Sequence, residues 1–253
     1  MVANQNYYEK QHTQDAGYGK SVFNLGRLTS SPGFRAWLRR QQGRPIRMLD
    51  VGCGKGQFLL DLTRHFRQQG QTIERVVGLD LVQCSPNVYD QVVPKMEFFQ
   101  QSVDGQKLPF PDDSFDFVSC NHVLEHIFQT EVLVREFHRV MDKRGLCVVS
   151  VPNIAAWMNR IAFLFGGQPL GSEVGVETTA YGFWPGFLKE KLTRFVPSGH
   201  IRDFTPGSLR DLTSACGFRP LGFWAQNGGF VCGLNPRLDR NLGIILESAG
   251  RTA

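Results

Sequence analysis

A glycine-rich turn is the clearest chemical signal in this 253-residue sequence. Asp50, Gly52, Gly54 and Gly56 occupy alternate positions in LDVGCGKGQF. Glycines let the chain bend sharply and let a ligand approach the backbone closely. Gln57 stands where the dinucleotide pattern GxGxxG needs its last glycine, and a carboxylate beside the turn would repel a pyrophosphate. The turn therefore favours a nucleoside that carries positive charge.

A second acid, Asp80, ends the apolar run VVGLD. An acid at this place in a nucleotide-binding unit can accept hydrogen bonds from both hydroxyls of a ribose. Alone, Asp80 would be read equally well as a turn residue after a strand. Its separation from the glycine turn suits the ribose role, so the two features together predict a site for an adenosine.

Histidines and a glutamate form the second chemical cluster. His122, Glu125 and His126 follow the pattern H-x-x-E-H, and His200 lies further along in GHIRDFT. Side chains three and four positions apart share one face of a helical turn, and the near-neutral pKa of histidine suits proton transfer. We expect His122, His126 and His200 to be the catalytic candidates. For His122 the alternative is a purely structural histidine.

Alternating strands and helices must position these groups. Apolar runs predict strands at 46–51, 75–80, 97–100, 115–120, 146–151, 220–224 and 243–248. Helical spacing predicts a helix that begins at Ser31-Pro32, one over 57–69, one from Thr130 to a stop at Gly145, and one over 205–217. This alternation is typical of a mainly parallel, doubly wound sheet, in which ligands bind at the carboxyl ends of the strands.

The composition is that of an ordinary globular protein, with 42% hydrophobic and 20% charged residues. The net charge of +5 is spread along the chain, which indicates a solvated surface rather than a nucleic-acid site. No apolar run approaches the ~20 residues that span a bilayer, and residues 1–15 lack the apolar stretch of a secretory signal. We therefore expect a cytoplasmic protein, and the six single cysteines predict reduced core residues.

Four segments resemble, in order and spacing, the motifs of class I S-adenosylmethionine-dependent methyltransferases. They are LDVGCGKGQF, VVGLD, DGQKLPFPDDSFDFVSCNHVLEHI and REFHRVMDKRGLCVVSVPN. The resemblance covers residues 46–153 and continues, less specifically, through 199–218. It implies an α/β fold with a Rossmann-like, seven-stranded, mainly parallel, doubly wound sheet and an antiparallel last strand.

The same resemblance implies where the cofactor, S-adenosylmethionine, binds. Asp50, Gly52 and Gly54 would surround its methionine part. Asp80 would hold the ribose, and Asn121 would lie next to the sulfonium. The complete predicted set, in which Leu81, Asp104 and Gly105 belong to the adenine side, is Asp50, Gly52, Cys53, Gly54, Gly56, Asp80, Leu81, Asp104, Gly105 and Asn121.

A divalent metal is the less favoured alternative for the histidine cluster. The cluster is similar to the E-x-x-E-H segment of ubiquinone-biosynthesis O-methyltransferases and small-RNA 2′-O-methyltransferases, which bind a divalent metal and add a later histidine. This chain departs from that pattern because His122 replaces the first glutamate. We therefore expect no metal, and keep a set of His122, Glu125, His126 and His200 as the alternative.

Two further regions are expected to border the site. Residues 1–45 are predicted to be a helical extension over the active site, where Tyr7 and Tyr8 would close over the cofactor. Residues 46–253 would form the methyltransferase domain. Within it, the aromatic-rich stretch 153–203 is too long for an ordinary connection and is predicted to be a lid for the acceptor.

The expected function is O-methylation of a hydroxyl on a small molecule such as a sugar, a polyketide or another metabolite. The alternatives are an RNA 2′-O-type methyltransferase and a non-catalytic cofactor-binding scaffold. We expect a small-molecule acceptor, no nucleic-acid or membrane partner, and a monomer or homodimer.

Overall fold

A seven-stranded sheet forms the centre of the computed structural model, with strand order β3-β2-β1-β4-β5-β7-β6. The strands are β1 Ile46–Val51, β2 Ile73–Asp80, β3 Glu97–Gln100, β4 Phe115–Asn121, β5 Met141–Pro152, β6 Phe218–Ala225 and β7 Asn241–Ser248. Strands β1 to β5 pair in parallel, and β7 is antiparallel to both of its neighbours. The structure describes residues 24–81, 89–92, 94–175, 177–183, 185–186, 197–226 and 235–250. The predicted fold class is confirmed.

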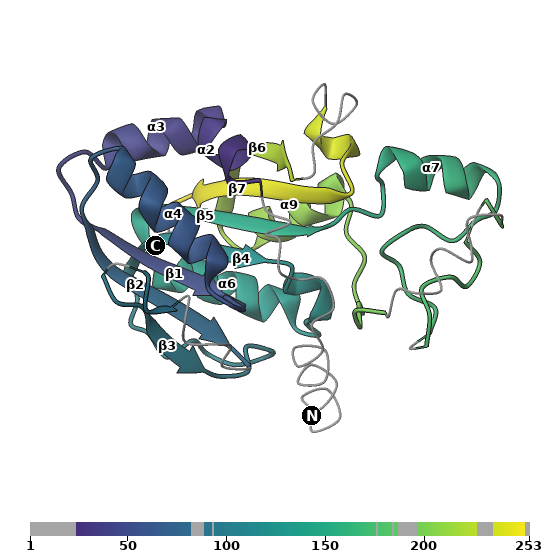
Figure 1. Ribbon diagram of the computed structural model, residues 1–253, viewed down its shortest axis with the longest axis horizontal. Helices are drawn as coiled ribbons and strands as arrows, with labels where there is room; N and C mark the ends of the chain where they lie inside the picture. Colours follow the sequence, from purple (N-terminus) through teal and green to yellow (C-terminus); the bar gives the residue numbers. More distant parts are fainter. Residues whose placement is uncertain are drawn as a thin grey trace.

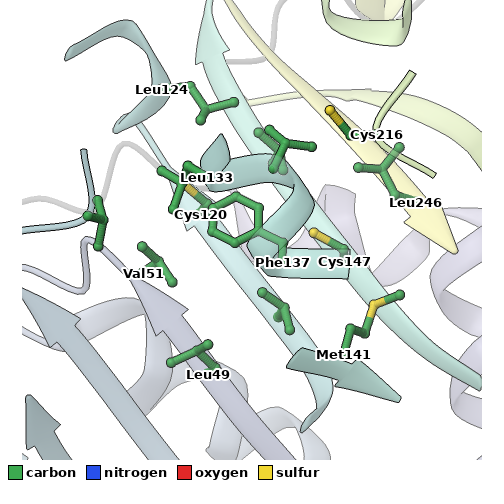
Figure 2. Packing of buried hydrophobic residues seen from close by; sticks show 14 of the residues in the cluster. Leu49, Val51, Cys120, Leu124, Leu133, Phe137, Met141, Cys147, Cys216 and Leu246 are labelled. Atoms are coloured by element: carbon green, nitrogen blue, oxygen red, sulfur yellow. The ribbon is translucent and has the colours of Figure 1, made fainter. Parts of the chain in front are cut away.

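Helices cover both faces of this sheet (Figure 1). They are α2 Leu25–Ser30, α3 Pro32–Arg40, α4 Gln57–Gln68, α6 Thr130–Val140, α7 Trp157–Leu164 and α9 Pro206–Ala215, with short 3₁₀ turns η1 Leu124–His126 and η3 Pro236–Leu238. Alternate residues of each strand enter opposite cores. Met48 and Phe117 pack with α3 and α4, whereas Leu49 and Val118 pack with α6 and α9. Figure 2 shows Phe137 of α6 among the buried residues of the second core.

The predicted stop of the third helix at Gly145 is wrong. Helix α6 ends at Val140, and β5 begins at the next residue, so the strand starts five positions earlier than its apolar run. A Cβ at Gly145 would lie 2.5 Å from Cγ of Met141 and 2.8 Å from the carbonyl oxygen of Asp142. The glycine therefore permits a close approach within the strand, at the place where the β4–β5 register shifts.

The described part of the N-terminal extension contributes buried side chains to the core. Ser31 caps α3 as predicted, and Phe34 and Trp37 are fully buried. Trp37 lies 5.7 Å from Phe117, ring centre to ring centre, and its Nε1 donates to the carbonyl of Arg144 at the amino end of β5. Tyr7 and Tyr8 lie outside the described residues, so the prediction that they cover the cofactor stays a prediction.

The two ends of the stretch 153–203 lie next to each other at the edge of the sheet. Asn153 bridges Phe204, and the Ile154 amide donates to the Phe204 carbonyl at 2.9 Å. Helix α7 and the chain after it lie beside the layered body of the domain (Figure 1). Several large apolar side chains in this stretch are exposed: Trp157, Met158, Ile161, Phe163, Leu164, Phe165, Val174, Tyr181 and Ile201. None of the helices in the described ranges has the length and apolar character needed to cross a bilayer.

Candidate cofactor and acceptor site

The glycine turn after β1 has the left-handed backbone conformation for which glycine is favoured. Gly52, Gly54 and Gly56 have φ angles of +77°, +50° and +77°, which side-chain-bearing residues adopt rarely. The amides of Gly52 and Cys53 both donate to the carbonyl of Leu79, at 2.7 and 3.2 Å. The turn is therefore tied by its backbone to the end of the neighbouring strand β2.

The space around the glycines differs from one to the next. A Cβ on Gly52 would lie 2.1 Å from Cγ2 of Val123, so the cofactor turn touches the loop after β4 directly. A Cβ on Gly56 would lie 2.7 Å from the ring of Tyr89. A Cβ on Gly54 would meet nothing within 4 Å. Gly54 thus faces open space that a ligand can occupy.

Asp80 and its neighbour Leu81 lie at the end of β2, beside this turn. The Oδ2 atom of Asp80 accepts a hydrogen bond from the amide of Gly54 at 2.8 Å. The contact fixes the carboxylate next to the open side of the turn, which is where a ribose would need it. The sequence prediction paired these two residues, and the structure brings them together.

Asp50 is buried at the end of β1, with 2% of its surface exposed. Burial and the charge of Asp80 raise its pKa to about 7, although a 2.7 Å hydrogen bond from Ser119 to Oδ1 acts in the opposite direction. A cation bound near Asp50 would favour the ionised form. The ammonium or sulfonium of S-adenosylmethionine would supply such a charge.

Asn121 ends β4 and offers a buried donor. Its Oδ1 accepts from the hydroxyl of Ser150 at 2.8 Å, while its Nδ2 is buried and has no hydrogen-bond partner among the described residues. A buried donor without a partner is costly, and a bound ligand would satisfy it. The open face of Gly54, the fixed carboxylate of Asp80 and this donor all fit S-adenosylmethionine.

Asp104 and Gly105 form a separate part of the predicted set. The two carboxylate oxygens of Asp104 accept from the amides of Phe128 and Gln129, at 3.2 and 2.9 Å. A Cβ on Gly105 would lie 2.3 Å from Nε2 of Gln129. Both residues therefore fix the chain between η1 and α6, and their predicted contact with adenine stays a prediction.

His122 directly follows β4 and has a φ angle of +55°, a strained value for a residue with a side chain. Its Nδ1 lies 3.2 Å from Oε1 of Glu125, and its Nε2 lies 2.8 Å from Oε1 of Gln226. Burial would lower the pKa of His122, but the hydrogen bond and charge of Glu125 outweigh it and raise the pKa. About a third (32%) of the side chain is exposed.

Gln226 is a site residue that the sequence did not indicate. It follows β6, is almost fully buried, and reaches His122 from far along the chain. Its neighbours AQNGG carry no recognisable motif. Only the strand order, which places β6 and β7 beside β5, brings it to this edge of the sheet.

Glu125, His126 and His200 form a compact cluster, in which one potential ligand atom from each lies within 4.8 Å of the others. The rings of His126 and His200 lie 5.0 Å apart. Burial would raise the pKa of Glu125, but the hydrogen bond and charge of His122, followed by the charges of the two clustered histidines, lower it. The structure thus groups three of the four residues of the alternative metal set and leaves His122 beside Glu125, outside the cluster.

Residues 49–149 match the model of a family described as a methyltransferase domain. The chain is also 28% identical, over 154 residues, to the demethylmenaquinone methyltransferase of Staphylococcus epidermidis; the match covers 58% of this chain and 62% of that protein. The chain therefore spans less than two thirds of the length of this curated relative.

Two solved structures show the same fold at low identity. The 1,6-didemethyltoxoflavin-N1-methyltransferase of Burkholderia thailandensis, solved with 1,6-didemethyltoxoflavin and S-adenosylhomocysteine, is 18% identical with a TM-score of 0.51, covering 91% of this chain and 85% of that one. The trans-methyltransferase CalH, solved with S-adenosylhomocysteine, is 14% identical with a TM-score of 0.53, covering 86% and 55%.

Proposed function

On the match of residues 49–149 to a methyltransferase-domain family and on the strand order of the sheet, we propose that the chain is a class I S-adenosylmethionine-dependent methyltransferase. It would transfer the methyl group of S-adenosylmethionine to a hydroxyl of a small molecule. The glycine turn, Asp50 and Asp80 would hold the cofactor, with Asn121 beside the reacting end. The sulfonium is already activated, so alignment of the acceptor and exclusion of water supply much of the rate.

The observation that carries the oxygen acceptor is the His122–Glu125 pair at the end of β4. A buried carboxylate on Nδ1 orients the imidazole and stabilises its charged form, as in other histidine bases. Both present partners of the ring are acceptor atoms, which fits the doubly protonated form and the raised pKa. The neutral ring would keep its proton on Nδ1 and offer the Nε2 lone pair.

The proposed reaction balances through His122. An acceptor hydroxyl takes the place of Gln226 at Nε2 and gives its proton to that nitrogen. The oxygen attacks the methyl carbon in line as the carbon–sulfur bond breaks. The products are a methyl ether, S-adenosylhomocysteine and a protonated His122, which then returns its proton to solvent.

The acceptor class follows from the surroundings of His122. The exposed apolar and aromatic side chains in the described part of 153–203, such as Trp157 and Tyr181, suit an apolar ring system better than a sugar. The similarity to a demethylmenaquinone methyltransferase supports a quinone-like ring system as the acceptor class, and it gives no support for oxygen as the methylated atom. An RNA acceptor has no comparable support among these observations.

Transfer from labelled S-adenosylmethionine to a panel of phenols, catechols, hydroquinones and sugars tests the proposal, with the methylated atom located by NMR. We expect an aryl methyl ether, and a kcat that falls about 10²- to 10⁴-fold in His122→Gln with an unchanged cofactor Kd. His65→Gln, on the far part of α4, is the matched control and should keep its rate. Methylation at nitrogen or carbon, or full activity of His122→Gln, would contradict the proposal.

Cofactor binding without transfer to any acceptor would favour the scaffold alternative.

A further inference from the structure

We propose that Glu125, His126 and His200 bind one divalent transition-metal ion, of the class of Zn²⁺, Co²⁺ or Mn²⁺. What such an ion would do rests on the proposed function, because it lies on the acceptor side of that same site. Whether it binds is independent of any methyl transfer. The cluster is the one group of three or more potential ligands found in the described parts of the chain.

The spacing of the three side chains suits a single ion. Their ligand atoms lie within 4.8 Å of one another. Ligands at about 2.0–2.2 Å from one tetrahedral ion are separated by roughly 3.5 Å. Small side-chain rotations therefore bring all three atoms onto one ion, without any movement of the backbone.

Both histidines are held in the form that binds metals. Nδ1 of His126 lies 3.1 Å from the carbonyl oxygen of Gly199, and Nδ1 of His200 lies 2.8 Å from that of Gly171. A carbonyl oxygen can only accept, so Nδ1 of each ring carries a proton, and in the neutral ring Nε2 would be the metal-binding atom. Metal-bound histidines are oriented by this kind of second hydrogen bond.

Glu125 supplies an unpartnered oxygen. The side chain is 1% exposed, and while Oε1 contacts His122, Oε2 is buried with no hydrogen-bond partner among the described residues. A buried, ionised oxygen without a hydrogen-bond partner carries an uncompensated desolvation cost. A cation between Glu125 and the two histidines would remove this cost.

The backbone around the cluster is fixed before any ion arrives. The carboxylate of Glu173 accepts from the amides of Ser198, Gly199 and His200, at 2.5, 2.7 and 3.1 Å. The carbonyl of Glu125 accepts from the amides of residues 201 and 202, at 2.8 and 3.1 Å. The loop that carries His200 is thereby fastened to η1, which carries the other two ligands.

Two nitrogens and one carboxylate are a donor set typical of zinc and other first-row ions, whereas Mg²⁺ and Ca²⁺ prefer oxygen ligands alone. Three protein ligands leave coordination positions open. An acceptor oxygen bound there would have a lower pKa. Glu125 would link the metal ion to the proposed base, because its other oxygen, Oε1, contacts His122.

Cobalt titration tests the inference with a direct optical readout. The full chain is stripped with a chelator, and Co²⁺ is added while the visible d–d absorption is followed. We expect saturation at one ion per chain, without a thiolate charge-transfer band, because no cysteine lies in the cluster. Glu125→Gln and His200→Ala should each weaken Co²⁺ binding about 100-fold or more, whereas His65→Ala should leave it unchanged. Calorimetry with S-adenosylmethionine verifies that each variant is folded.

The outcomes separate the two proposals. Absence of a saturable site, or equal Co²⁺ affinity in wild type and in both ligand variants, would overturn the metal inference. If the metal-stripped protein carries out aryl O-methylation at its full rate, the proposed function stands and the ion has no role in catalysis. Saturable Co²⁺ binding that depends on Glu125 and His200, with methylation at nitrogen or carbon, would support the site and refute the proposed function alone.

Discussion

The two halves of the site are built in different ways. On the cofactor side, the backbone amides of Gly52, Cys53 and Gly54 make the decisive contacts, all of them with the end of the adjacent strand β2. On the acceptor side, side chains from distant segments meet, as His122 does with Gln226. The first half depends on conformations that few residues can adopt. The second depends on side chains that can be exchanged. We therefore expect that cofactor binding and acceptor choice can be altered separately.

Gly52 is the point at which the two halves touch, and its replacement should have the largest effect. Gly52→Ala would place a Cβ 2.1 Å from Val123 at a φ of +77°. Backbone strain of about 1–2 kcal/mol and overpacking of about 1–3 kcal/mol predict a loss of roughly 3 kcal/mol in the free energy of unfolding. Urea denaturation measures it.

Two companion variants separate strain from crowding. Gly52→Ala combined with Val123→Ala removes the clash and should regain part of the loss. Gly54→Ala, at a φ of +50° with nothing within 4 Å, should cost about 1 kcal/mol of stability while weakening cofactor binding. Equal stability losses in Gly52→Ala and Gly54→Ala would refute the contact between the two halves.

The next largest effect is expected from Asp80, whose loss should affect the cofactor half alone. Asp80→Ala removes a charged acceptor of hydrogen bonds worth about 2 kcal/mol, and the Kd for S-adenosylmethionine should rise about thirtyfold. Calorimetry gives the value. Asp90→Ala, an exposed acid on the surface, is the control. Unchanged affinity would remove Asp80 from the cofactor site.

On the acceptor side, Glu173→Gln should loosen the His200 loop and leave the cofactor half intact. The neutral amide keeps the size of the side chain but weakens the hydrogen bonds to three backbone amides. We expect amide exchange at 198–200 to accelerate about fivefold, corresponding to ~1 kcal/mol. Cofactor affinity should not change; a parallel fall in it would show that the halves are coupled.

The smallest predicted signal is the release of part of a proton from Asp50 when the cofactor binds. With a pKa of about 7, Asp50 is roughly half protonated at pH 7 in the ligand-free protein. A cationic cofactor would ionise it, releasing about 0.5 proton per cofactor bound. Calorimetry in buffers of different ionisation enthalpy detects this release. Asp50→Asn should abolish it.

The same group predicts how the stability of the ligand-free protein depends on pH. The folded-state pKa of Asp50 lies above the ordinary value of 3.8, so the folded protein holds a proton that the unfolded chain has lost. Stability from this group is therefore full below about pH 4 and declines as the pH rises through about 7. Asp50→Asn should show a flatter profile; a decline of equal size in the variant would assign it to another group.

The proximity of the glycine turn, Asp80 and His122 could be predicted from the sequence more completely than the contacts of Gln226 and Glu173, for a physical reason. The turn, Asp80 and His122 lie at the ends of strands, and parallel strands end at one edge, so their proximity follows from topology alone. The start of β5 was missed because Asp142, Lys143 and Arg144 interrupt its apolar pattern. In the structure Met141 pairs with Phe115 of β4, and pairing resumes only at Leu146, so these three residues lie in the register shift of the strand.

Gln226 and Glu173 could not be found in the same way. Gln226 acts through a side chain whose partner lies 104 positions away, and Glu173 through amides 25 to 27 positions away. Neither lies in a periodic pattern or a motif. The pairing of His126 with His200 was suggested by a resemblance, but the exclusion of His122 from that cluster depended on the orientation of its ring toward Gln226.

The meeting of Asn153 with Phe204 has a consequence for how this molecule can be altered. A β-bridge joins the two ends of the intervening fifty or so residues. A short linker could therefore replace this segment and close the chain at little entropic cost. Replacing the segment would remove α7, Glu173 and His200 together and would leave all seven strands in place. Under the proposed function, we predict that transplanting this one continuous stretch of chain would change the acceptor preference.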